Sequence, residues 1–323
     1  MLFASLRRRR AASAAAMYTF SRRLRRASRR VEPGAAVRIG FSLDPRLELG
    51  PGDELALVKR GAELGYESAW TPAGPDAAAF ERCLRWYEAS ALPVGIAVVP
   101  AADQPPAFYA EHARRVHEGT GGNFSFGVGS GRMAHAATGM RAYLGELRPL
   151  LAEGQPLYLG ALGPLMLRLA GEQADGVSLN WCAADMVAWS RKRVEAAAGE
   201  AGRKTPVIAM YIRTCVDPDP ELARATLGRA ALMYALGAPA YRRHFERMGF
   251  AEELVGIERE GAKPSADFLA AAGAAGAPGQ VRGQFDAIAA AGVDVAIVRV
   301  LSPRPGDAES VLRALEECAP SRA

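Results

Sequence analysis

Hydrophobic residues along this chain occur in short apolar runs that alternate with amphipathic segments of helical periodicity, from about residue 36 onward. Such runs bounded by Gly, Pro and Asp are typical of β-strands, and apolar spacings of three and four are typical of helices. We predict eight strands, at 37–43, 67–73, 92–100, 123–131, 156–161, 176–181, 205–216 and 293–301. We predict helices at 52–65, 76–89, 105–119, 138–153, 163–173, 184–200, from 219 onward, at 278–291 and at 307–318.

Alternation of strand and helix over this length predicts an α/β fold of the (β/α)8 TIM-barrel type. Several strands are apolar with little alternation, as expected when both faces of a parallel sheet are covered. The main rival is an open doubly wound sheet, whose first strand is often followed by G-x-G-x-x-G. Residues 43–53, LDPRLELGPGD, hold no such turn. We therefore predict one barrel domain over 37–323, with the Gly- and Ala-rich segment 249–277 as an irregular insertion.

The bulk composition, 50% hydrophobic and 23% charged over 323 residues, is that of a globular protein. No apolar run approaches the roughly 18 residues of a membrane span. The 4 cysteines lie far apart, without histidines at metal-ligand spacing. We predict no metal site, and interpret the cysteines as reduced thiols of a cytoplasmic protein.

Residues 1–30 contain ten arginines and no acidic residue, whereas the whole chain has a net charge of only +5, so the rest of the chain is mildly acidic. This composition fits a transit peptide or a segment that binds nucleic acid or an anionic membrane. The plainer interpretation is a disordered extension over 1–36, or a start codon assigned too early. We adopt it, and predict no nucleic-acid or membrane partner.

Glycine-rich corners follow the fourth and fifth predicted strands. GALGP, residues 160–164, leads from a strand into a helix, and helix N-termini attract phosphate. Gly160 and Gly163 would permit close backbone approach or a positive φ, and Pro164 suits the first helical turn. Packing alone is the other explanation of this corner. The glycines of FGVGSG, residues 126–131, leave room for a flat ligand or form a tight turn.

Together these stretches resemble the bacterial-luciferase-like family of flavin- and deazaflavin-dependent oxidoreductases, over about residues 37–318. The motifs, in family order, are VRIGFSL, GYESAW, VGIAVVP, GNFSFGVGSG, PLYLGALGPLMLRLAGEQADG and GAPGQVRGQFDAIAAAGVD. Residues 156–180 and GAPAYRRHFERMGF, residues 237–250, are most similar to methylenetetrahydromethanopterin reductase-like members, which use coenzyme F420.

The resemblance implies a (β/α)8 barrel with cofactor at its mouth. It places a non-prolyl cis peptide bond at Ala97-Val98, behind the isoalloxazine ring. It assigns cofactor phosphate binding to the corner after the fifth strand. The cofactor-binding residues that it implies are Ala97, Val98, Ala161, Leu162, Gly163 and Pro164, and the glycine-rich end of the fourth strand adds Gly129, Ser130 and Gly131 as candidates.

The usual proton-handling groups of the family are replaced in this chain. Ala73-Gly74 stands where many members have Asp-His or Glu-His, and Ser42 and Arg132 stand where some have glutamate. We therefore take three residues as catalytic candidates: His135 as acid or base, Arg132 as a partner for an anionic group, and Ser42 as a hydrogen-bond donor.

The other candidates have structural alternatives. His112, His117 and His244 are interpreted as packing or surface residues. For Trp70 and Trp181 we consider two roles, stacking on a ring or an apolar substrate, or packing in the core. Arg132, Arg242 and Arg243 would favour F420 over FMN if they lie at the mouth, because the F420 tail is longer and more acidic.

We expect an F420-dependent oxidoreductase that passes hydride between cofactor and a small organic substrate. One alternative is an FMN-dependent monooxygenase of the same fold. Another is a flavin- or F420-binding protein without turnover. Family members are often dimers, and the sequence leaves a homodimer open.

Overall fold

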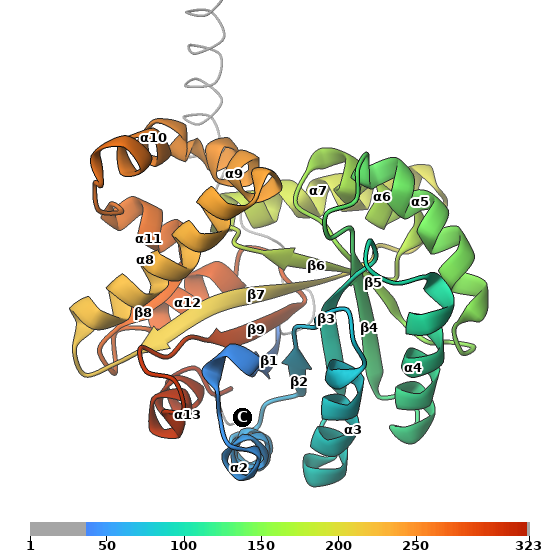
Figure 1. Cartoon of the computed structure of the whole chain (residues 1–323), viewed down its shortest axis with the longest axis horizontal. Coiled ribbons are helices and arrows are strands. Elements are labelled where there is room, and N and C mark those ends of the chain that lie inside the picture. The colour runs from blue at the N-terminus through green and yellow to red at the C-terminus, as the bar shows by residue number, and fades with distance from the viewer. Residues whose placement is uncertain (1–36, 322–323) are drawn as a thin grey trace, which may run out of the picture.

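The computed structural model describes residues 37–321, which form a closed barrel of parallel strands wrapped by helices (Figure 1). The predicted extension over 1–36 lies outside the described residues. Eight strands close the barrel in the order β1 to β6, then β7 and β9, and β9 pairs with β1. The predicted (β/α)8 fold is therefore confirmed.

The bounds of eight strands agree with the predicted runs to within a few residues, and β8 was not predicted. The strands are β1 (Arg38–Ser42), β2 (Ser68–Thr71), β3 (Val94–Pro100), β4 (Phe124–Gly129), β5 (Leu157–Gly160), β6 (Gly176–Asn180), β7 (Val207–Val216), β8 (Gly273–Gly276) and β9 (Val295–Val300).

The helices outside the barrel likewise begin and end close to their predicted limits. They are α2 (Pro51–Glu63), α3 (Ala78–Ser90), α4 (Pro106–Gly119), α5 (Ala136–Leu147), α6 (Pro164–Gln173), α7 (Ala184–Glu200), α8 (Pro220–Gly237), α12 (Arg282–Ala289) and α13 (Ala308–Glu317). Local chemistry explains the agreement at α8, where Asp219 accepts hydrogen bonds from the backbone N–H of Glu221 at 2.9 Å and of Leu222 at 3.2 Å.

The prediction that 249–277 is irregular was wrong. After α9 (Pro239–Phe245) and a π-helical turn (η3, Glu246–Phe250), the segment forms α10 (Ala251–Glu260), α11 (Ala266–Ala272) and strand β8. Leu254, Ile257 and Phe268 bury their side chains, so this segment has its own apolar face. The hydrophobic pattern of this segment was missed because it is rich in Ala and Gly, which contribute little to hydrophobic periodicity.

Strand β8 adds a ninth strand to the sheet. It pairs in parallel with the C-terminal part of β7, where Arg213 lies opposite Gly273. A Cβ on Gly273 would clash with the carbonyl oxygen of Arg213, so the close approach requires glycine. Backbone proximity rather than β-propensity places this strand.

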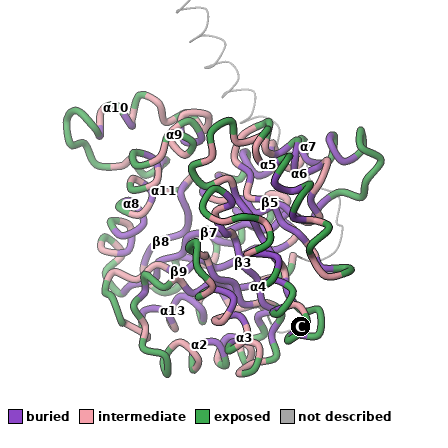
Figure 2. The backbone as a smooth tube through the Cα atoms, turned by 45° about the vertical axis from the view of Figure 1, so that its right-hand side comes forward, coloured by how far each residue is buried: buried purple, intermediate pink, exposed green. Residues whose placement is uncertain are grey.

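The buried residues lie in the strands and on the inner faces of the helices (Figure 2). One cluster fills the space between strands and outer helices, and a smaller one, including Trp70, Tyr158 and Tyr211, fills the barrel interior. A third cluster, around Trp181, Phe245 and Phe268, lies beneath α8 to α11. None of the helices within 37–321 has the length and apolar character needed to cross a bilayer.

Candidate active site

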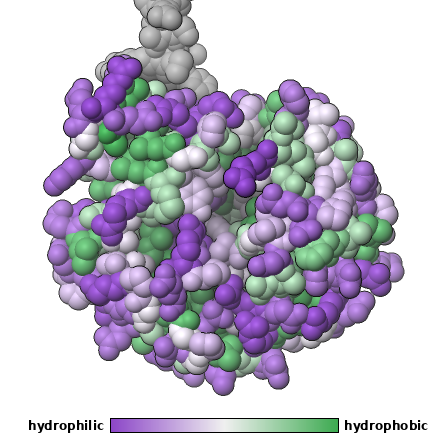
Figure 3. Space-filling model, viewed as in Figure 1, coloured by the Kyte–Doolittle hydropathy of each residue, from purple (hydrophilic) through white to green (hydrophobic). Residues whose placement is uncertain are grey.

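The carboxyl ends of the parallel strands meet at one rim, which is where the active sites of such barrels are built. The space-filling view shows the molecule hollowed near the centre of one face, between α8 and α9 on one side and α5 to α7 on the other (Figure 3). The sequence-predicted residues are distributed around this rim, and the structure brings only some of them together.

The predicted cis peptide bond is present between Ala97 and Val98, where the pairing of β3 with β4 shifts register. The Val98 side chain lies over three glycines of the neighbouring strands. A Cβ on Gly127 would lie 3.0 Å from it, one on Gly129 2.6 Å, and one on Gly160 3.4 Å. The room predicted for a ligand over Gly129 is therefore filled by Val98, and a ligand at this place would rest on Val98.

The turn after β4 has the tight geometry that was one of the two predicted alternatives. Gly131 has φ +56, and its Cβ position lies 3.2 Å from Pro100. Arg132 and His135 follow in this turn and are exposed. His135 has φ 49 at the N-cap of α5, without a side-chain hydrogen bond to the helix. Within 37–321, no hydrogen bond or ion pair joins Arg132 or His135 to Ser42.

The corner after β5 presents an open helix N-terminus. Gly163 is the N-cap of α6 with φ −110, Pro164 follows it, and no side chain caps the helix. Neither Gly160 nor Gly163 has a positive φ, so that alternative was wrong for both. Nothing lies within 4 Å of a Cβ placed on Gly163. The first turn of α6 is thus accessible to an anion.

A group of arginines lies beside this corner. The Arg247 guanidinium donates to the carbonyl oxygen of Leu162 at 3.4 Å and lies 5.6 Å from the Trp189 ring, and Arg193 lies 4.2 Å from the same ring. Burial and the charges of Arg193 and Arg243 lower the pKa of Arg247. None of these three arginines forms an ion pair within 37–321. The corner is therefore electropositive.

Sequence reasoning missed Arg193 and Arg247, since both lie on helices far along the chain from residue 162. Of the arginines it named, Arg243 contributes to this group, whereas Arg242 is engaged by Glu246 at 3.1 Å and Glu258 at 2.6 Å. The sequence shows that 242–247 contains several arginines, but it does not show which of their side chains point towards the α6 corner.

Ser42 lies inside the rim rather than on it. Its side chain is fully buried and its hydroxyl accepts a hydrogen bond from Arg299 at 2.8 Å. Arg299 also pairs with Asp44, which accepts hydrogen bonds from Arg46 at 2.7 and 3.0 Å. Burial opposes ionisation of Asp44, but the charge of Arg299 and the hydrogen bonds from Arg46 outweigh it and lower the pKa to about 2.

Both candidate tryptophans are buried, 3% exposed for Trp70 and 1% for Trp181. Trp70 packs against Tyr158 at 5.8 Å inside the barrel. Trp181, at the end of β6, lies 4.3 Å from the guanidinium of Arg213. The contacts of Trp70 therefore support a packing role. The ring of Trp181, by contrast, faces the positively charged guanidinium of Arg213.

His244 is buried next to Trp181. Its Nε2 lies 2.8 Å from the carbonyl oxygen of Trp181 and 3.5 Å from the Cys182 sulfur. Burial lowers the pKa of His244 to about 4, so the ring is neutral at physiological pH.

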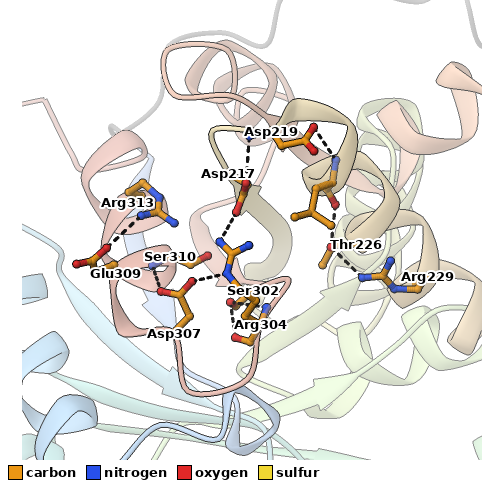
Figure 4. A network of polar contacts seen from close by, with 11 residues as sticks. Asp217, Asp219, Thr226, Arg229, Ser302, Arg304, Asp307, Glu309, Ser310 and Arg313 are labelled. Atoms are coloured by element: carbon orange, nitrogen blue, oxygen red, sulfur yellow. Dashed lines mark hydrogen bonds and ion pairs between the residues drawn. The ribbon is translucent and has the colours of Figure 1, made fainter.

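A polar network ties two loops of the rim together (Figure 4). Asp217, after β7, accepts from Arg304 at 2.7 Å, and Arg304 donates to Asp307 at 2.9 Å. Asp307 in turn caps α13 by accepting from the backbone N–H of Ser310 at 2.9 Å. The ends of β7 and β9 are therefore fixed relative to each other. Across the described residues, His, Cys, Asp and Glu side chains do not gather into a group of three that could hold a metal ion.

Comparison with known proteins agrees with this geometry. Residues 143–295 match the model of the luciferase-like monooxygenase family. The resemblance predicted from the sequence is thereby confirmed over this part, which contains the α6 corner and β7.

The chain is also similar in sequence to an individual protein of known activity. A 5,10-methylenetetrahydromethanopterin reductase from Methanopyrus kandleri is 30% identical over 153 residues, covering 44% of this chain and 44% of that protein. The chain thus matches less than half the length of this relative.

Solved structures show that the fold is shared. The coenzyme F420-dependent tetrahydromethanopterin reductase of Methanopyrus kandleri has a TM-score of 0.69 at 20% identity, over 88% of this chain and 98% of that one. The oxygenating constituent of 3,6-diketocamphane monooxygenase from Pseudomonas putida, in complex with FMN, has a TM-score of 0.59 at 16% identity, over 88% of this chain and 97% of that one.

Proposed function

We propose that this chain is a luciferase-like oxidoreductase that binds coenzyme F420 and passes hydride between it and a small organic substrate. One observation carries the proposal: the open N-terminus of α6 at Gly163 lies beside Arg247, whose charge no carboxylate within 37–321 balances. An uncapped helix end and a cation at the same corner favour a phosphate.

The residues present fit an anionic cofactor tail. Arg193 and Arg243 reinforce Arg247, and these three charges suit a tail with several negative groups better than a single phosphate. This favours F420 over FMN. On the ring side, Val98 and the glycines behind it offer a surface without protruding polar groups.

When bound, the deazaflavin supplies the hydride chemistry, while the protein supplies position and electrostatics. His135 and Arg132 stay predictions as catalytic groups, and their exposure places them in contact with solvent. Ser42 stays a prediction as a hydrogen-bonding group. Its hydroxyl is already engaged by Arg299, which supports a positioning role rather than proton transfer.

Cofactor titration tests the proposal. F420 and FMN are titrated into the purified protein, its Arg247→Met variant and an Arg242→Met control. We expect F420 to bind more tightly than FMN, and R247M to weaken F420 binding about tenfold or more, the value of one charged hydrogen bond. The control should change little, because Arg242 is satisfied by Glu246 and Glu258.

The alternatives give different results in the same experiment. Tighter binding of FMN, with oxygen consumption on its reduction, would favour the monooxygenase. Tight binding of F420 without an absorbance change with any of a panel of alcohols, aldehydes and imines would favour a binding protein. Binding of neither cofactor would overturn the proposal.

A further inference from the structure

Two arginines stand side by side inside the barrel at its carboxyl end. The register of β7 and β9 pairs Arg213 with Arg299. Side chains alternate between the faces of a strand, so both arginines share the inner face with Tyr211 and Ile297, two positions earlier. They are 3% and 1% exposed. Two buried positive charges on paired residues need anionic or hydrogen-bonding partners, because each charge raises the electrostatic cost of burying the other.

Arg299 is compensated within the protein. It donates to Ser42 at 2.8 Å and pairs with Asp44. It also lies 5.0 Å from the Tyr211 ring. Its hydrogen-bonding capacity and its charge thus have partners.

Arg213 is not compensated. Among residues 37–321, no hydrogen bond or ion pair involves its guanidinium, and its Nη1 is buried without a partner. Its neighbours are aromatic rings, at 4.3 Å for Trp181, 5.7 Å for Tyr211 and 5.8 Å for Tyr234. Ring faces attract a cation but do not satisfy its N–H groups as an oxygen acceptor does.

We propose that Arg213, with Arg299 beside it, binds the carboxylate group of an anionic substrate at the barrel mouth. This inference rests on the proposed function, since it names the substrate class of the same site. Asp44 is the carboxylate of this buried group, and Arg299 shares it with Arg46, so Arg213 is left without an anionic partner. A carboxylate matches this one uncompensated guanidinium and offers it two oxygen acceptors in a planar arrangement.

The arginines of this subsite differ from those of the cofactor corner. Arg247 contacts Leu162 after β5, whereas Arg213 faces the ring of Trp181 after β6. The aromatic walls suit a substrate whose carboxylate is attached to a flat or apolar group. The loop network through Asp217 and Arg304 holds β7 and β9 in place, which keeps the two guanidinium groups preorganised.

Calorimetric titration of benzoate, its neutral analogue benzamide and inorganic phosphate tests the subsite, with and without F420. We expect benzoate to bind at least about tenfold more tightly than benzamide, and R213M to weaken benzoate binding more than phosphate binding. Arg213→Met, which keeps an unbranched apolar stem and removes the charge, should abolish the preference for benzoate. Arg213→Lys should retain part of it.

The matched control is Arg82→Met. Arg82 likewise lies beside a tryptophan and is mostly buried, but it is paired with Glu54 at 3.3 Å on the outer helices. This variant should keep the preference, and F420 affinity should stay within about twofold of the wild type in both methionine variants.

Each outcome decides. Equal binding of benzoate and benzamide by the wild type, or an unchanged preference in R213M, overturns the carboxylate subsite. Phosphate binding that R213M weakens more than it weakens benzoate binding overturns the carboxylate assignment, whereas phosphate bound at the Arg247 corner is unaffected by R213M. If R213M does not fold, the wild-type comparison and R213K decide alone. If F420 binds and benzoate does not, only this inference fails. If benzoate binds through Arg213 and neither F420 nor FMN binds, the proposed function fails.

Discussion

The Nη1 atom of Arg299 donates a hydrogen bond to the hydroxyl of Ser42 at 2.8 Å, across a sequence separation of 257 residues. The bond is fully buried and joins β9 to β1, the two strands whose pairing brings the first and last parts of the barrel together. Ser42, which we predicted from the sequence as a catalytic candidate, is therefore part of the structure that holds the rim.

Replacing Ser42 with alanine should mainly affect stability. It leaves a buried guanidinium N–H without an acceptor, which costs about 1–3 kcal/mol. Urea unfolding measures the change in the free energy of unfolding. A loss below about 0.5 kcal/mol would contradict the importance of this bond, and a shifted pH profile of turnover would show that Ser42 handles protons.

Gly129→Ala should disturb the β3 bulge. Its Cβ would lie 2.6 Å from the stiff side chain of Val98, and such overpacking costs typically about 1–3 kcal/mol. In the double variant with Val98→Ala much of the loss should be recovered, because the clash is removed. Gly145→Ala on α5 is the control. Nothing lies within 4 Å of its Cβ, so it should be neutral or slightly stabilising. Equal losses in both alanine variants would refute the explanation.

His244 should make stability depend on pH between about 6.5 and 4. Its pKa is lowered to about 4 in the folded protein, from 6.5 when unfolded, so the unfolded chain binds the proton first. The stability it contributes is fully present above pH 6.5 and falls as the pH drops towards 4, by roughly 3 kcal/mol. Unfolding at several pH values, compared with His244→Gln, measures this. An identical slope in the variant would argue against a buried neutral histidine.

Asp44 should act in a lower range. Its pKa is about 2 in the folded protein and 3.8 otherwise, so its contribution is present above pH 3.8 and is lost as the pH falls through 2. The shift corresponds to about 2 kcal/mol. Asp44→Asn should be less stable at neutral pH, because Arg299 loses its charged partner, and should lack this acid-dependent loss. Denaturation curves between pH 4 and 2 distinguish the two proteins. Parallel losses in both would assign the effect to other groups.

Part of the geometry of this rim was predicted from the sequence. The GALGP corner and the turn at Gly131 were predicted from short motifs within single loops, and the cis bond at Ala97-Val98 from the family resemblance. Arg247 and Arg213 were not found, because neither has a local signal. Arg247 contacts Leu162 only because the helices after β7 fold back towards β5. Arg213 is one charged residue within an apolar strand, and its sequence neighbours do not indicate a site.

By itself, the sequence determined the strands and helices that close the barrel and their order, though not the elements within 249–277, because hydrophobic period and turn residues act over a few positions. Only the tertiary structure decided which charges meet. The register of β7 on β9 pairs Arg213 with Arg299. Ser42, at the end of β1, and Asp44, after it, supply partners to Arg299 but not to Arg213. Such contacts join residues far apart in the chain, and burial, which sets their energetic weight, exists only once the barrel has closed.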